Sequence, residues 1–352
     1  MSDSSFDSGL QVDQWSAKYL KEYVRASQLK PLMGKTPNAP IQLIEDLGKK
    51  PGDDITVPLV TRLSGSGITG DSTLEGNEEA LGNYGHKITV DQLRNAVRVG
   101  HMANKKGPFD LLEAAKPMLK LWSMDKLRSA VLDALGSANV DGATAYASCN
   151  ETQKDAWLAA NADRVLFGAA KSNNDGNDHS ASIDDVDKTN DTLTASVVSL
   201  AKRMAKAADP HIRPIRVDGK GEWYVMLAGS YPFRDLKTDL KGEFEAAGVR
   251  GRDNPLFTDG DLIWDGVIIK EIPEIGVITG VGAASADVGM NYLLGAQAVG
   301  LAWGERPHPI SETSDYGNLR CVGVAEIRGV EKLMFNSVQN MVTVLTAAVA
   351  DS

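Results

Sequence analysis

The chain has 352 residues, of which 42% are hydrophobic and 24% are charged, and these ordinary values exclude a wholly disordered or a fibrous protein. Its 37 basic and 47 acidic residues give a net charge of −10, which argues against recognition of duplex DNA as the main task, because phosphate contacts need a basic face. The 34 glycines exceed the usual share of about 7%, which favours strands, turns and loops over a helical bundle.

The start of the chain predicts a short helix followed by an extended arm. Residues 12–29 place aromatic side chains at helical spacing, and three prolines and a glycine then break the chain between 31 and 40.

The first residues lack the basic and apolar regions of a signal peptide. The only two cysteines, Cys149 and Cys321, form no disulfide framework or metal motif by spacing. We therefore expect a soluble protein made in a reducing cytoplasm, with no membrane segment.

Two alternating segments predict a two-stranded finger. Residues 54–63 alternate, and Pro58 among them limits this strand to an edge. Residues 86–99 also alternate, with a phase change of one residue that indicates a bulge. Between the two segments, residues 64–85 hold six glycines and almost no apolar side chains. A compact domain rarely keeps more than about 12–15 structureless residues without a functional reason. A flexible active-site lid is the competing interpretation.

Residues 109–135 predict the longest helix, which at 1.5 Å per residue would be ~40 Å long and act as a strut. The expected buried face consists of Leu111, Ala115, Met118, Trp122, Leu127, Val131 and Ala134.

The rest of the chain predicts a body of mixed helices and strands. The polar, acidic segment 171–191 is expected to be a solvated surface loop. The other expected elements are a helix at 192–208, a hairpin at 212–229, strands at 262–270 and 275–281, and a hairpin around residues 336–340.

Two glycine motifs raise the possibility of a dinucleotide site. Gly65–Gly70 reads GSGITG, but the acidic, glycine-broken segment after it cannot form the buried helix that such a site needs. Gly280–Ser285 fits better, because the pattern predicts a strand, a glycine turn and then a helix. However, few residues remain for partner strands, and no acidic ribose ligand follows about 20 residues later. A nucleotide- or NAD-dependent enzyme using Gly280–Ser285 is the alternative function.

No other pattern indicates chemistry. Residues 173–178 resemble a calcium loop in composition, but aligning Gly176 with the invariant glycine places Lys171 at the first ligand position. The five histidines are isolated and form no metal or catalytic spacing. We therefore predict no catalytic, cofactor-binding or metal-binding residues, and no cofactor.

Several blocks of the chain, in order, resemble the major capsid proteins of tailed bacteriophages, in the branch typified by the lytic coliphage N-four. The blocks read SGSGITGDSTLEGNEEAL, WYVMLAGSYPFRDLKTD, NPLFTDGDLIWDGVIIKE, MNYLLGAQAVGLAWG and YGNLRCVGVAEIRGVEKLMFNS, and together they cover about residues 55–350. The first and third of these blocks are the most specific.

This resemblance implies an α+β chain with the Hong Kong 97-type capsid fold, which has an N-terminal arm, an extended loop, a peripheral domain with a long spine helix, and an axial domain. The boundaries expected from it are 1–47 for the arm, 48–105 for the extended loop, 106–140 for the spine helix, 141–254 for most of the axial domain, 255–281 for peripheral strands, and 282–352 for axial and C-terminal strands. It implies a structural protein without enzymatic activity, which self-assembles into hexamers and pentamers of an icosahedral shell around double-stranded DNA.

The resemblance also implies partners and a contact surface. Besides other copies of itself, the chain is expected to meet a portal protein, a cement protein in some shells, and the packaged DNA without sequence recognition, and to be assembled into virions in the host cytoplasm. Because no long, charged helical extension precedes the arm, we also expect a separate scaffolding protein. An encapsulin-like nanocompartment is a second alternative. The residues expected to contact a neighbouring subunit lie in the extended loop: Gly65, Gly67, Gly70, Glu75, Gly76, Glu78 and Glu79.

Overall fold

The computed structural model describes residues 29–45, 54–63, 65–71, 73–106, 109–217, 221–241, 257–258 and 261–350. The chain divides into two compact units. The smaller unit contains residues 92–127 and 306–327, and the larger unit contains the described parts of 28–91, 128–305 and 328–352. The helix predicted for residues 12–29 lies outside the described residues, apart from its last position.

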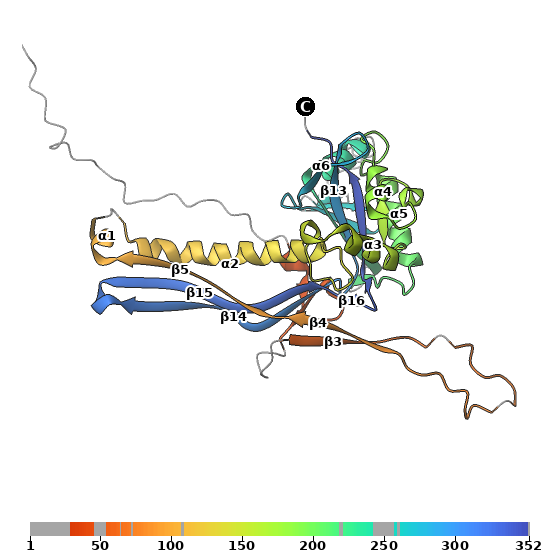
Figure 1. The fold of residues 1–352 in the computed structure, drawn as a ribbon, viewed down its shortest axis with the longest axis horizontal. Helices are drawn as coiled ribbons and strands as arrows, with labels where there is room; N and C mark the ends of the chain where they lie inside the picture. The colour runs from red at the N-terminus through yellow and green to blue at the C-terminus, as the bar shows by residue number, and fades with distance from the viewer. Residues whose placement is uncertain are drawn as a thin grey trace, which may run out of the picture. The chain divides into compact units, whose positions relative to one another are not determined.

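The mixture of helices and strands confirms the predicted α+β class (Figure 1). The helices are α1 (His101–Lys106), α2 (Leu111–Leu135), α3 (Glu151–Ala160), α4 (His179–Asp184), α5 (Ala195–Ala207) and α6 (Ser230–Asp239), with short 3-10 turns at Lys30–Leu32, Tyr146–Ser148, Lys171–Asn173 and Asp315–Gly317. The strands are β1 (Met33–Gly34), β2 (Ile41–Ile44), β3 (Asp54–Val60), β4 (Asn83–Thr89), β5 (Asp91–Gly100), β6 (Val165–Phe167), β7 (Ile215–Val217), β8 (Gly221–Ala228), β9 (Phe257–Thr258), β10 (Asp261–Trp264), β11 (Val267–Glu271), β12 (Val277–Gly282), β13 (Ala286–Leu294), β14 (Val299–Ser314), β15 (Leu319–Lys332), β16 (Met334–Phe335), β17 (Val338–Gln339) and β18 (Met341–Ala347).

In the smaller unit, the long helix α2 begins at a capping aspartate. The carboxylate of Asp110 accepts a hydrogen bond from the backbone N–H of Leu112 at 2.9 Å, which is the main reason that its pKa is lowered. The helix itself is confirmed, but its predicted inner face is partly wrong, since Leu111 is 37% exposed. Ala115, Val131 and Ala134 of the predicted face are buried. Within the smaller unit, the buried positions of the helix are Ala115, Leu119 and Ser123, four residues apart.

The shift of this face has a polar cause. The hydroxyl of Ser123 donates to the carboxylate of Glu326 on β15 at 3.0 Å, and both residues are buried. A hydrophobic pattern cannot place a serine on the inner face, because only its buried partner makes that position favourable.

The larger unit is built on a sheet with the strand order β6-β18-β13-β8-β11-β10-β9, to which β12 and β7 add as partners of β13 and β8. Successive residues of a strand point to opposite faces, and β18 shows this directly. Val342 and Val344 join a core with α5 and α6, whereas Leu345 and Ala347 join a second core with α3 and α4. Helices therefore cover both faces of the sheet.

Three predicted elements of the larger unit are confirmed. Helix α5 matches the prediction for 192–208, with Thr194 as its N-cap. Strands β7 and β8 form the predicted antiparallel hairpin. Strands β16 and β17 form the predicted C-terminal hairpin, with Asn336 and Ser337 in the left-handed region that a two-residue turn requires.

Other predictions for this unit are wrong. The segment 171–191 is not a solvated loop, because it contains α4 and buries His179, Ile183 and Val186 completely or nearly so. The predicted strand at 262–270 is a hairpin of β10 and β11, which turns at Asp265 and Gly266 with positive φ angles of 46° and 70°.

The segment after Gly280 is also different from the prediction. Residues 283–285 form a tight turn, with positive φ at Ala284 and Ser285, and the chain continues into β13 instead of a helix. Strand β13 is buried along nearly all of its length, and a strand covered on both faces reads as a continuous apolar run, which periodicity alone cannot distinguish from a buried helix. Gly280–Ser285 therefore lacks the helix N-terminus that would receive a pyrophosphate.

The described part of the predicted arm packs within the larger unit. Strand β2 pairs in parallel with β14, from Ile41 opposite Val299 to Ile44 opposite Ala302. Leu29 and Ile41 are fully buried. Residues 29–45 thus belong to the body of the subunit.

Candidate assembly surfaces

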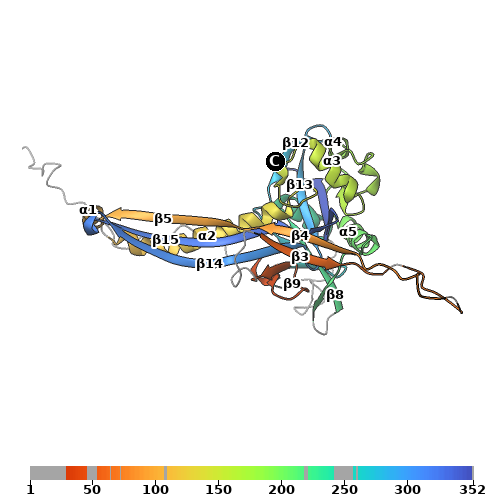
Figure 2. The ribbon, with the colours of Figure 1, turned by 60° about the horizontal axis from the view of Figure 1, so that its bottom comes forward.

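The predicted finger is an antiparallel hairpin of β3 and β4 (Figure 2). Its register runs from Asp54 opposite Thr89 to Val60 opposite Asn83. Pro58 is tolerated because each strand of a two-stranded sheet has a free edge. The predicted bulge after β4 is instead the boundary between β4 and β5, which belong to different sheets.

The part of the hairpin beyond this ladder, residues 61–82, is called the hairpin tip below. The backbone N–H of Thr61 donates a hydrogen bond to the carbonyl of Gly82 at 2.9 Å. This bond closes the hairpin tip at its base. Most of its described side chains are exposed, including Leu63, Leu74 and Leu81 at 59–62%. A segment with this many exposed leucines has no core of its own, so it gains stability only from another surface.

All seven residues predicted to contact a neighbour lie in the hairpin tip: Gly65, Gly67, Gly70, Glu75, Gly76, Glu78 and Glu79. The glycines at 67, 70 and 76 have φ angles of 70–87°, which most other residues avoid. Glu79 accepts a hydrogen bond from the N–H of Gly65 at 2.7 Å, and Glu78 accepts one from Gly76 at 2.8 Å. Two of the three glutamates therefore shape the tip itself, which the sequence did not predict.

The root of the hairpin is packed into the larger unit. Ile88 on β4 is fully buried in a cluster with Ala302, Leu333 and Phe335. Gly329 on β15 faces this root so closely that an added Cβ would lie 2.2 Å from the carbonyl oxygen of Thr89. The exposed tip thus extends from an anchored base.

We expect Gly329→Ala to destabilise the subunit by about 1–3 kcal/mol, because the methyl group would displace the β4 backbone in a close-packed region. Gly276→Ala is the matched control, since no atom lies within 4 Å of a Cβ at that glycine. Urea denaturation of the two variants measures the difference. Equal stabilities would contradict the packing described for the root.

A buried histidine and glutamate complete the root. His86 Nδ1 accepts a hydrogen bond from the N–H of Met334 at 3.4 Å, so the neutral imidazole carries its proton on Nε2. That nitrogen faces the carboxylate of Glu331 at 3.4 Å, and the other oxygen of Glu331 accepts from the N–H of Thr89 at 2.9 Å. These contacts join β4 to β15 and β16 through polar groups that are largely buried.

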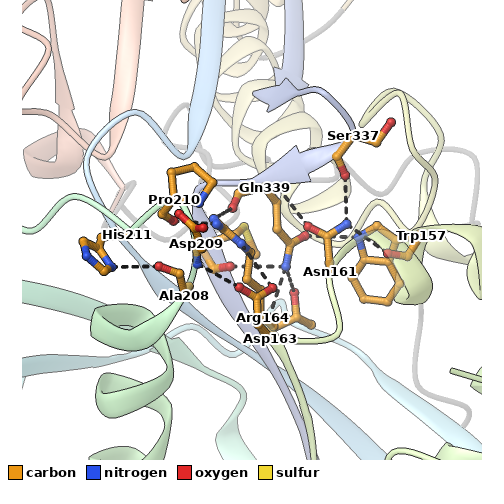
Figure 3. A network of polar contacts seen from close by, with 12 residues as sticks. Trp157, Asn161, Asp163, Arg164, Ala208, Asp209, Pro210, His211, Ser337 and Gln339 are labelled. Atoms are coloured by element: carbon orange, nitrogen blue, oxygen red, sulfur yellow. Dashed lines mark hydrogen bonds and ion pairs between the residues drawn. The ribbon is translucent and has the colours of Figure 1, made fainter. Parts of the chain in front are cut away.

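A polar network holds the C-terminal hairpin against α3 (Figure 3). The guanidinium of Arg164 donates to the carbonyls of Gln339 and Pro210, each at 2.5 Å. The Gln339 side chain accepts from the indole N–H of Trp157 at 3.1 Å, and its backbone N–H donates to Asn161 at 2.9 Å. Sequence reasoning missed this network entirely, because its members are far apart along the chain and form no motif.

Lys332 is buried beside this network. Its ammonium group donates to the carbonyl of Ser137 at 2.6 Å and to Gln339 at 3.2 Å, and it lies 5.5 Å from the Trp157 ring. Burial lowers the pKa of Lys332 from 10.5 to about 7.

The unfolded chain therefore binds one more proton than the folded chain between about pH 7 and pH 10.5, and stability rises with pH across this window. We expect the wild-type protein to gain up to about 1.4 kcal/mol of unfolding free energy per pH unit from this residue. Lys332→Met should lose this gain, while the exposed control Lys188→Met should keep it. Chemical denaturation at pH 7.5 and 9.5 measures the difference; a Lys332→Met protein with the wild-type pH dependence would contradict the assignment.

The described residues contain no group of three or more His, Cys, Asp or Glu side chains arranged to hold a metal ion. Within the same part of the chain, no helix combines the length and the apolar character needed to cross a membrane. After Gly65–Gly70 the described residues contain turns and coil rather than a helix. The hairpin combines an anchored root with an exposed tip that carries several leucines, and exposed apolar side chains of this kind are typical of surfaces through which chains associate.

Comparisons with known proteins identify the class. Residues 3–349 match the family described as phage capsid protein, so the chain belongs to that family. The major capsid protein of Pseudomonas phage KPP25 is 28% identical over an alignment of 344 residues, which covers 92% of this chain and 89% of that protein. A chain of the capsid asymmetric unit of cyanophage Pam1 is 36% identical with a TM-score of 0.90, and a chain of the Ralstonia phage GP4 capsid is 23% identical with a TM-score of 0.76. Both structural matches cover 100% of each chain.

The chain is thus a major capsid protein of a phage and a part of the virion, as the resemblance implied. Its fold is that of phage capsid subunits. Capsid proteins of this family self-assemble into shells.

Proposed function

We propose that this capsid protein forms hexamers and pentamers that close into an icosahedral shell around the double-stranded DNA of a tailed phage. The hairpin tip is the observation that carries this proposal, because it exposes leucines from an anchored root and has no core of its own. A closed shell supplies the same neighbour to every copy, so a weak contact is repeated over the whole particle.

The hairpin tip is the proposed contact with a neighbouring subunit, through the loop residues 65–79 that were predicted from the sequence. Ion pairs at such an exposed surface contribute only ~0–1 kcal/mol each. Burial of the exposed leucines adds about 1.5–3 kcal/mol for each side chain that is fully covered. Apolar contact is therefore the larger contribution, and the acidic residues select the surface on which the tip lies.

The remaining parts of the proposal are supported by the resemblance of the sequence to capsid proteins of tailed phages. The protein acts without catalysis, in the domain arrangement expected from the sequence, except that residues 29–45 of the expected arm belong to the body of the subunit. It is assembled in the host cytoplasm with a separate scaffolding protein and a portal protein, and in some shells of this kind a cement protein binds the finished particle. Assignment to the branch of coliphage N-four belongs to the same proposal. The net charge of −10 is consistent with a shell that repels its packaged DNA and does not bind it to the inner surface.

Size-exclusion chromatography followed by electron microscopy tests the proposal, on the chain expressed with and without the scaffolding protein of its phage. We expect closed particles with icosahedral symmetry at least when both proteins are present. Monomers under both conditions would contradict shell formation. Saturable micromolar binding of NAD or ATP by the purified chain would instead support the enzyme alternative.

A further inference from the structure

An exposed ion pair joins the hairpin tip to the body of its own subunit. The guanidinium of Arg62, near the base of the tip, donates a hydrogen bond to the carboxylate of Asp209 at 3.0 Å. These residues are 147 positions apart in the chain, and Asp209 lies two residues after the end of α5. The contact therefore links the hairpin to a second part of the larger unit, apart from the cluster around Ile88 that holds its root.

The turn that carries Asp209 is held in place by the polar network of Figure 3. The backbone N–H of Asp209 donates to the carboxylate of Asp163 at 3.1 Å. The carbonyl of the next residue, Pro210, accepts from the buried guanidinium of Arg164, which also lies 3.5 Å from Asp163. Buried groups thus fix the position of an exposed carboxylate, so Arg62 meets a partner that is already in place.

The ion pair and the root hold the hairpin at opposite ends of its ladder. The ladder runs from Asp54 and Thr89 at the root to Val60 and Asn83, and Arg62 lies just beyond its far end. An isolated two-stranded ribbon is only marginally stable in water, and it twists more strongly than a wider sheet. A ribbon that is held only at its root can change direction, whereas a ribbon held at both ends of its ladder must first break the second contact.

We propose that the Arg62–Asp209 pair is a latch that fixes the direction of the hairpin in the unassembled subunit and so presents the tip for association. The purpose of the latch rests on the proposed shell assembly, but the latch itself is a property of a single chain. Ordering the hairpin before association lowers the conformational entropy that each contact between subunits must offset. Because both side chains are exposed, salt should screen the pair and weaken the latch.

Distances between two spin labels test the latch in the unassembled subunit. The labels are attached to Ala80→Cys in the hairpin tip and Lys206→Cys on α5, and Cys149→Ala and Cys321→Ser remove the native thiols. Double electron–electron resonance at low salt should give one narrow distribution of distances. Asp209→Asn should abolish this narrow distribution and give a broad one, and about 1 M salt should broaden the distribution of the unsubstituted pair in the same way.

A second exposed ion pair provides the matched control. Glu113→Gln removes the pair with Lys116 on α2, which does not involve the hairpin, and should leave the distribution narrow. Arg62→Glu should broaden the distribution, and Asp209→Lys in the same chain should restore part of the narrow component. The same distribution in Asp209→Asn and in the unsubstituted pair would overturn the latch.

The initial rate of shell assembly, measured by light scattering with the scaffolding protein of the phage, tests what the latch does. Asp209→Asn should slow assembly by about two- to fivefold, the range that an exposed ion pair provides, and Glu113→Gln should not. An unchanged or faster rate for Asp209→Asn would overturn the role of the latch in presenting the tip. If the unsubstituted chain forms no shells, the proposed function fails, while the distance distributions still decide whether the latch exists.

Discussion

A chain in which residues 62–81 are replaced by Asn-Gly should remain a folded, soluble subunit and should fail to form stable closed shells. Thr61 and Gly82 already meet through a hydrogen bond at the base of the tip, so a two-residue turn can join them without disturbing the ladder. The cluster around Ile88 and the contacts of His86 lie on the other side of this joint and are retained. The shortened chain loses only the exposed segment.

Circular dichroism and urea denaturation should therefore match the wild-type subunit, while electron microscopy should show no closed shells or only ones that dissociate at low temperature. A variant that replaces Leu63, Leu74 and Leu81 by serine, at full length, separates apolar contact from loop length and should show the same defect in a milder form. Unfolding of the shortened subunit would show that the tip belongs to the subunit core. Shells of unchanged yield and thermal stability would show that the tip contributes nothing to assembly.

Arg164→Met should destabilise the subunit by about 3–5 kcal/mol, the largest effect that we expect from a single substitution. Arg164 is fully buried and holds two backbone carbonyls from segments far apart in the chain. Methionine fills much of the volume but leaves both carbonyls without their charged donor, and each lost bond of this kind costs about 1.5–3 kcal/mol.

Arg203→Met on the exposed side of α5 is the matched control and should change stability by less than about 0.5 kcal/mol. The unfolding midpoint in urea, measured on unassembled subunits, gives both values. If the two variants unfold at the same denaturant concentration, the network around Arg164 does not stabilise the fold.

Predictions made from local patterns were the most accurate. The helices at 111–135 and 195–207 and the hairpins at β3–β4, β7–β8 and β16–β17 follow from periodicity, caps and turn residues that lie close together in the sequence. The errors arise where burial depends on distant partners. Strand β13 lacks a period because both of its faces are covered. Segment 171–191 is polar yet partly buried, because its side chains bond to one another and to α3, as His179 does with Glu151 at 3.2 Å.

The candidate surface was predictable in part for the same reason. The glycines and glutamates of the hairpin tip form one continuous segment. The sequence alone therefore predicted that this segment extends away from the body of the subunit. The anchoring of its root by Glu331 and Gly329 was not predictable, since about 240 residues separate them from β4.

A reconstruction of the assembled shell at side-chain resolution tests the central claim most directly, because it shows where the hairpin tip of each subunit lies. We predict that residues 61–82 lie on a neighbouring copy and bury Leu74 and Leu81 against it. Tips that project into solvent, or that fold back on their own subunit, would contradict the account of this hairpin as the contact that joins copies into a shell.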